Sequence, residues 1–113
     1  MGATIFKILP RPLWEEAVAQ GEFHGSPLDA ADGYIHFSTA AQVRETAARH
    51  FAGITDLVLV AVPEDVLGDA LKWEKSRGGD FFPHLYAPLR VTFAAWVKPL
   101  PVGPDGQHSF PEL

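Results

Sequence analysis

The chain contains one long, purely apolar run, Leu57-Val58-Leu59-Val60-Ala61-Val62. Six residues are far fewer than the ~20 that a membrane-spanning helix needs. A run without a polar face is typical of a strand that is covered on both sides. The sequence therefore predicts a central strand at this point, with structure packed against each of its faces.

The other elements are predicted outward from this strand. Strands are expected over Thr4–Leu9, Gly33–Phe37, Ala70–Lys75 (Leu71 and Trp73 inward) and Val91–Lys98, where Val91, Phe93, Ala95 and Val97 share one side. Helices are expected over Pro12–Gln20, which Gly21 ends, and over Thr39–Ala52, where Thr39 and Gln42 have capping-box spacing. Residues 22–33, rich in Gly, Pro and Asp, are expected to be mostly loop.

The order of the elements predicts the fold class. Both helices fall in the first half of the chain, which favours an α+β fold over a regular βαβ array. We expect a single compact domain with two small, strongly bent sheets and two main helices. The 113 residues suit one domain, which we assign to residues 1–98. Residues 99–113 form a Pro/Gly-rich tail.

Composition excludes several classes of function. The chain has no cysteine, which removes disulfide scaffolds, thiolate metal sites and cysteine nucleophiles. A net charge of −5 without a Lys/Arg stripe argues against nucleic acid as a partner. No signal peptide or membrane segment is visible, so a cytoplasmic location is expected. The five histidines show no metal-binding spacing, and no metal is expected.

The stretch Gly33-Tyr34-Ile35-His36-Phe37-Ser38-Thr39 is the first candidate for a functional site. In a strand, Ile35 and Phe37 face the core, while Tyr34, His36 and Ser38 line the opposite face. His36 can hydrogen-bond a ribose hydroxyl or act as an acid or base beside the helix start predicted at Thr39. The alternative interpretation is a partly buried structural histidine next to an ordinary helix cap.

The second candidate is Phe81-Phe82-Pro83-His84-Leu85-Tyr86-Ala87-Pro88-Leu89. His84 and Tyr86 share a face in an extended chain, and the prolines stiffen the segment. A rigid segment of this kind can form a ring-stacking pocket. The alternative is a proline-anchored loop whose aromatic rings merely cover the core.

Glu74, near the end of a predicted strand, is the third candidate. A carboxylate at the edge of a cleft can stabilise the positive charge that develops at a sugar carbon during bond cleavage. The alternative is a surface residue paired with Lys72 or Lys75. No nucleotide-binding glycine motif and no serine nucleophile elbow is present.

These residues carry a resemblance to a known family. Trp14, GYIHFST, Gln42 with Phe51, the DLVLVAV strand, Trp73-Glu74 and FPHLYAPL together resemble the bacterial domain-of-unknown-function family 952, over residues 4–98. IHFST and FPHLY are the most specific pieces. Ala87 departs from the pattern, where members often have glycine, which affects the shape of the loop more than its chemistry.

The resemblance implies a fold and a ligand. The family is grouped with the ADP-ribosyltransferase-like superfamily, whose members bind NAD in a cleft between two small sheets. By this analogy, His36 would hold the nicotinamide ribose, Tyr86 with His84 would stack on the ring, and Glu74 would assist cleavage. Tyr34, Ser38 and Thr39 complete the predicted ligand-binding set.

Three interpretations of function remain open. The first is an enzyme that cleaves the nicotinamide–ribose bond of NAD, with NAD as substrate and His36 and Glu74 as catalytic residues. The second is a non-catalytic module that binds a nucleotide-like small molecule in the same cleft. The third is a partner protein with no ligand. The sequence does not determine the oligomeric state.

Overall fold

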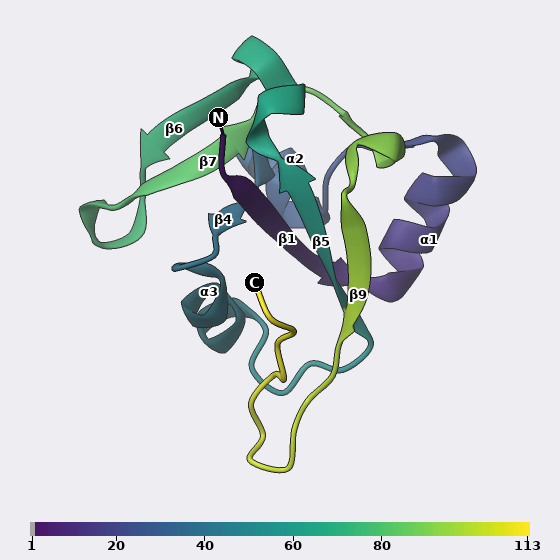
Figure 1. Ribbon diagram of the computed structural model, residues 1–113, viewed down its shortest axis with the longest axis vertical. Helices are drawn as coiled ribbons and strands as arrows, with labels where there is room; N and C mark the ends of the chain where they lie inside the picture. Colours follow the sequence, from purple (N-terminus) through teal and green to yellow (C-terminus); the bar gives the residue numbers. More distant parts are fainter. Residues whose placement is uncertain (1) are drawn as a thin grey trace.

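A computed structural model describes residues 2–113, which fold into antiparallel sheets and short helices (Figure 1). The four-stranded sheet has the order β4-β1-β5-β9, with β1 (Thr4–Pro10), β4 (Ser38–Thr39), β5 (Leu57–Pro63) and β9 (Trp96–Leu100). The three-stranded sheet has the order β3-β7-β6, with β3 (Ile35–His36), β6 (Leu71–Lys75) and β7 (Phe81–Leu85). β2 (Glu22–Phe23) pairs with β8 (Leu89–Arg90).

The helices are short. They are α1 (Arg11–Gln20), α2 (Pro27–Asp32) and α3 (Val43–His50), together with the 3₁₀ segments η1 (Glu64–Ala70), η2 (Arg77–Gly79) and η3 (Val91–Phe93). None of the helices in the described residues combines the length and apolar character that a membrane span requires. The α+β class is confirmed. Three small sheets take the place of the two that were expected.

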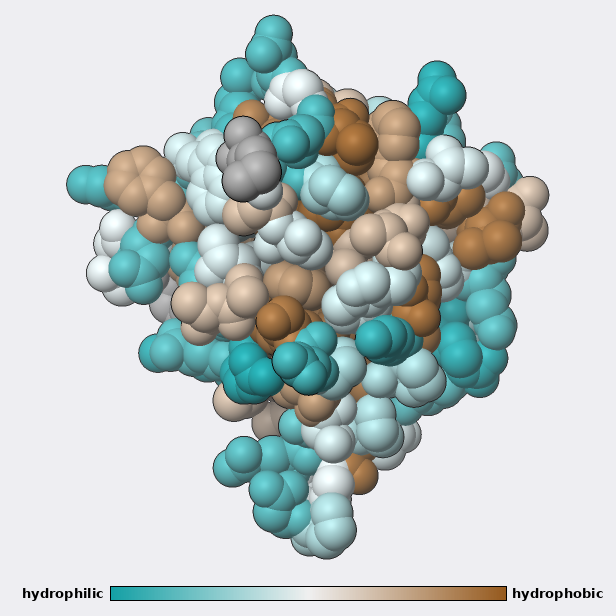
Figure 2. Space-filling model, in the orientation of Figure 1, coloured by the Kyte–Doolittle hydropathy of each residue, from teal (hydrophilic) through white to brown (hydrophobic). Residues whose placement is uncertain are grey.

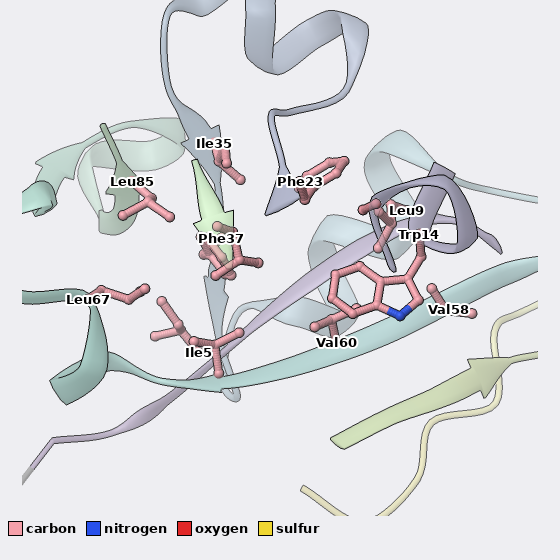
Figure 3. Packing of buried hydrophobic residues seen from close by; sticks show 13 residues of the cluster. Ile5, Leu9, Trp14, Phe23, Ile35, Phe37, Val58, Val60, Leu67 and Leu85 are labelled. Carbon is pink, nitrogen blue, oxygen red and sulfur yellow. The ribbon is translucent and has the colours of Figure 1, made fainter. Parts of the chain in front are cut away.

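β5 is the centre of the fold, as the apolar run predicts. Every residue from Leu57 to Val62 is buried, and β5 pairs with β1 along Thr4–Pro10 and with β9 on its other side. One face of the sheet packs against α1 and the smaller sheets, where Trp14 lies beside Val58 and Val60 (Figure 3). The other face packs against α3 through Leu59 and Ala47.

The prediction that residues 22–33 are mostly loop is wrong. Ser26 caps α2, because its hydroxyl accepts a hydrogen bond from the Asp29 N–H while the Asp29 carboxylate accepts one from the Ser26 N–H. This is a capping box. The Gly and Pro residues suggested a loop, but Pro27 occupies the first turn of α2, where its lack of an N–H costs nothing.

The prediction of a helix over Thr39–Ala52, capped by Thr39, is also wrong at its start. Thr39 belongs to β4 and pairs with Ile5, so its backbone is extended. The helix begins only at Val43. Half of the expected box is present, since the Gln42 side chain accepts a hydrogen bond from the Thr39 N–H at 3.0 Å.

Two of the alternating patterns were also misinterpreted. Residues 91–93 form the turn η3, and the strand starts at Trp96, which leaves Val97 exposed. Trp73 is exposed rather than inward, because β6 is an edge strand that projects with β7 from the body of the molecule (Figure 1). On the face drawn in Figure 2, apolar side chains form separate groups between hydrophilic ones.

Candidate functional site

Strands β3 and β7 bring the two predicted histidines together. His36 is the register partner of His84, and Ile35 is the partner of Leu85. Because side chains alternate along a strand, Ile35 and Leu85 face the core (Figure 3), and both histidines lie on the opposite face. Their ring centroids are 5.6 Å apart.

Tyr34 lies at the centre of this face. Its ring stacks on His84, with centroids 4.0 Å apart and an angle of 25° between the planes. The Tyr34 ring is also 4.6 Å from His36 and 5.2 Å from Tyr86. Burial and the negative charge of Asp32 raise the pKa of Tyr34. The expectation that Tyr86 stacks on the ring of a ligand stays a prediction, and the structure adds Tyr34 as the ring that stacks on His84.

Glu74 links His84 to Tyr86. Its Oε1 atom accepts a hydrogen bond from the Tyr86 hydroxyl at 2.7 Å and lies 2.8 Å from Nδ1 of His84. The hydrogen bonds from His84 and Tyr86 lower the pKa of Glu74. The bond to Glu74 raises the pKa of Tyr86 to about 12. The side chains of His84 and Tyr86 therefore fix the position of the Glu74 carboxylate.

A cavity of about 430 Å³ runs beside the histidines. His36, Ser38 and His84 are among its lining residues. The other predicted site residues, Tyr34, Thr39, Glu74 and Tyr86, are not. The Ser38 hydroxyl lies 2.9 Å from that of Thr46. Within the described residues, Nε2 of His84 makes no hydrogen bond, and no fully buried polar side-chain atom is unpaired. His84 is buried, with 3% of its surface exposed, but its ring lines the cavity, so Nε2 is the ring nitrogen left to bond a ligand there.

Asp29, which contacts His36, also forms a buried ion pair with Lys7. The Lys7 ammonium is 2.9 Å from Oδ2 of Asp29, and both side chains are less than a tenth exposed. Burial lowers the pKa of Lys7. Burial alone would raise the pKa of Asp29, but the hydrogen bond with His36 and the charge of Lys7 outweigh it and hold that pKa well below its usual range.

Both ring nitrogens of His36 face carboxylates. Nδ1 is 2.6 Å from Oδ1 of Asp29, and the His36 N–H donates to the same oxygen at 3.1 Å. Nε2 is 2.9 Å from the carboxylate of Asp32, which is about two-fifths exposed. His36 is thus fully engaged, and a ligand reaches it by displacing Asp32.

The sequence interpretation missed Lys7, Asp29 and Asp32. Two signals for them were present: Lys7 is the one charged residue inside an apolar strand, and Ser26 and Asp29 have the spacing of a capping box. Neither signal shows that α2 delivers Asp29 to β1. In the described part of the chain, no three His, Asp or Glu side chains gather so as to hold a metal ion.

Comparison with known proteins identifies the family. A family model described as "Protein of unknown function (DUF952)" matches residues 8–97. The chain belongs to this family. The family resemblance drawn from the motifs is confirmed, while the wider grouping with ADP-ribosyltransferase-like proteins stays a prediction.

Solved structures of a relative support the same fold. The crystal structure of protein CC0527 from Caulobacter crescentus is 50% identical to this DUF952 chain, with a TM-score of 0.91 over 95% of this chain and 94% of that one. The solution NMR structure of CC0527 is 51% identical, with a TM-score of 0.84 over 92% and 90% of the two chains. No match was found among curated proteins.

Proposed function

We propose that the site binds a planar base joined to ribose, in particular the nicotinamide end of NAD, and cleaves the bond between base and sugar. The observation that carries the proposal is the placement of His36 and His84 side by side on one cavity, with the Tyr34 ring stacked on His84. Aromatic rings bind a planar base by stacking. Imidazole nitrogens bind sugar hydroxyls or exchange protons with them.

The charges around the site favour a cationic group over a phosphate. Lys7 is neutralised by Asp29, and the carboxylates Asp32 and Glu74 contact the two histidines directly. Lys72, the register partner of His84, is a cation near this face, and its charge contributes to the lowered pKa of Glu74. Carboxylates stabilise a positively charged nicotinamide ring and the positive sugar carbon of an oxocarbenium-like transition state. The phosphates of NAD would extend away from this end of the cavity.

Each residue then has a role in the reaction. The bond from sugar carbon C1′ to the ring nitrogen breaks, its electron pair stays on that nitrogen, and nicotinamide leaves as a neutral molecule. Water or an acceptor hydroxyl attacks C1′, and its proton passes to Nε2 of His84. Glu74 positions His84 through Nδ1 and stabilises the imidazolium that forms. His36 binds a ribose hydroxyl in place of Asp32.

The roles of the other predicted residues follow from their positions. Tyr34 and Tyr86 form a ring surface next to His84, outside the lining of the cavity, on which a base that extends past His84 would stack. Ser38 provides a hydroxyl on the cavity wall. Thr39 has no role in this scheme. A non-catalytic nucleotide-binding module would use the same ring surface, but it would not need a histidine whose Nδ1 is fixed by a carboxylate while Nε2 is open.

Nicotinamide release from NAD tests the proposal. The purified protein should release nicotinamide from NAD faster than the uncatalysed reaction does. It should also release nicotinamide from nicotinamide riboside, because no group in the proposed site binds phosphate. Glu74→Gln and His84→Ala should lower the rate about 100-fold, the scale of general base catalysis. Glu16→Gln, a change on the exposed face of α1, should leave it unchanged.

Calorimetry separates the alternatives. Binding of NAD without nicotinamide release, unaffected by Glu74→Gln, identifies a binding module and contradicts the catalytic proposal. Absence of both release and binding at millimolar NAD contradicts the choice of ligand.

A further inference from the structure

Strand β1 has an open edge. On one side it pairs with β5 along its whole length, but on the other side β4 pairs only with Ile5 and Phe6. The chain that precedes β4 turns away, because the Phe37 N–H donates to the Pro83 carbonyl in β7 at 3.0 Å. The edge of β1 over residues 7–10 is therefore open where the two larger sheets separate.

The phase of the β1–β5 ladder determines which groups face this opening. The Arg11 N–H donates to the Asp56 carbonyl at 2.8 Å, and the Glu64 N–H donates to the Ala3 carbonyl at 2.9 Å. Residues that bond to one neighbour alternate with residues that face away from it. Odd-numbered residues of β1 thus bond to β5, and the N–H and C=O of Ile8 face the opening. In the described part of the chain, neither group makes a hydrogen bond.

The open edge forms one side of the cavity described above. Every residue from Phe6 to Pro10 lines it, together with residues of α2 and of α3. On one face of β1, Asp29 of α2 bonds to Lys7, and on the other face α3 packs with Ile8. The edge is therefore recessed between two helices. A recessed edge of this kind is reached more easily by a single extended chain than by the edge strand of another folded sheet.

We propose that this groove binds an extended polypeptide segment, which adds to β1 as a strand. The Ile8 N–H and C=O offer a donor and an acceptor with the spacing that a second strand's backbone matches. Pro10 lacks an N–H and offers only its carbonyl, a placement typical of an edge position. The segment thus gains about three backbone hydrogen bonds from this edge.

The lining of the cavity defines the side chains of the segment. Among the described residues that line the cavity, Lys7 and Asp29 are the only ones of the Lys, Arg, Asp or Glu type, and they neutralise each other. Leu13, Leu28 and Phe51 contribute apolar surface. At ~3.3 Å per residue, the edge from Phe6 to Pro10 spans about five residues. The segment is therefore a short, uncharged stretch with apolar or β-branched side chains.

Selection from a displayed library of random heptapeptides tests the proposal. The wild-type protein is the target, and Leu28→Trp, which places a large ring at an exposed position of the groove wall, is the counter-target. Enriched peptides should be uncharged with apolar or β-branched residues, should bind wild type at least tenfold more tightly than Leu28→Trp, and should shift the Ile8 amide resonance in NMR spectra.

Backbone methylation of a selected peptide is the decisive control. N-methylation of the residue that pairs with Ile8 should weaken binding about fivefold or more, the equivalent of one lost hydrogen bond. N-methylation of the next residue, whose N–H points away from β1, should change binding less than twofold. Equal effects at both positions, or no peptide enriched over Leu28→Trp, would overturn the proposal. Because NAD is absent from these assays, failure here leaves the proposed reaction unaffected.

Discussion

Two of the histidine–carboxylate contacts among the described residues, Asp29 with His36 and Glu74 with His84, differ in the burial of the carboxylate. Asp29 is almost fully buried and is bonded by Lys7, Ser26 and His36. Glu74 is two-fifths exposed, whereas His84 itself is buried, with 3% of its side chain exposed, and its Nε2 makes no hydrogen bond within the described residues. The Asp29–His36 pair therefore has every partner satisfied, whereas the Glu74–His84 pair leaves one ring nitrogen without a partner, and in the proposed reaction only the second pair transfers a proton. Burial of the carboxylate, rather than the presence of a histidine, separates the two roles.

The largest effect should come from removing the buried carboxylate. Asp29→Ala leaves the Lys7 ammonium buried without a counter-charge, and breaking one partner of a buried pair costs about 3–5 kcal/mol. Asp32→Ala, an exposed neighbour of the same histidine, is the matched control and should cost less than about 1 kcal/mol. Urea denaturation measures both. Equal losses would contradict the distinction between the two regions.

Removing both buried charges should restore part of the stability. In Lys7→Met/Asp29→Ala no buried charge is left unpaired, so the double variant should be more stable than Asp29→Ala alone. The loss of the α2 capping box should keep it below wild type, by about 1 kcal/mol. A double variant that is less stable than Asp29→Ala would show that Asp29→Ala does not leave the Lys7 ammonium buried without a counter-charge.

The pH dependence of unfolding should report the same carboxylate. The folded-state pKa of Asp29 lies below its unfolded value of ~3.9, so the unfolded chain takes up this proton first as the pH falls. The stabilisation is present above about pH 5 and is lost progressively toward pH 2. The difference in unfolding free energy between wild type and Asp29→Asn should therefore shrink over this range. A difference that stays constant would contradict the lowered pKa.

The smallest effect on stability should come from changing Glu74, the partly exposed carboxylate that contacts His84 and Tyr86. Glu74→Gln should leave the denaturation midpoint close to wild type, but it should lower the pKa of Tyr86 from about 12 toward the ordinary ~10, because the phenolate no longer faces a carboxylate. Ultraviolet titration of tyrosinate measures this shift. Tyr86→Phe leaves Tyr34 as the only tyrosine and assigns the two steps. An unchanged titration would mean that Glu74 and Tyr86 are not hydrogen-bonded in solution.

Local patterns predicted one half of the candidate site and missed the other. Alternation along two short segments indicated which faces carry His36 and His84, and strand pairing then placed those faces together. Asp29 was not predicted because its contact with Lys7 joins residues 22 positions apart. The contact also depends on helix α2, which the Gly and Pro residues of this segment made look like a loop. The prediction that Thr39 caps a helix is wrong because Thr39 pairs with Ile5 of β1, so its backbone belongs to a strand rather than to the start of a helix.

Histidine-ring NMR during titration with NAD tests most directly the claim that the Glu74–His84 pair is the functional one. Each of the five histidines gives its own ring signal, and His24 and His108, which are not among the residues lining the cavity, serve as internal controls. The account predicts saturable shifts of the His84 and His36 signals, reduced in Glu74→Gln, with His24 and His108 unmoved. Ring signals of His84 and His36 that do not move at millimolar NAD, or equal shifts of all five histidine signals, would contradict this claim.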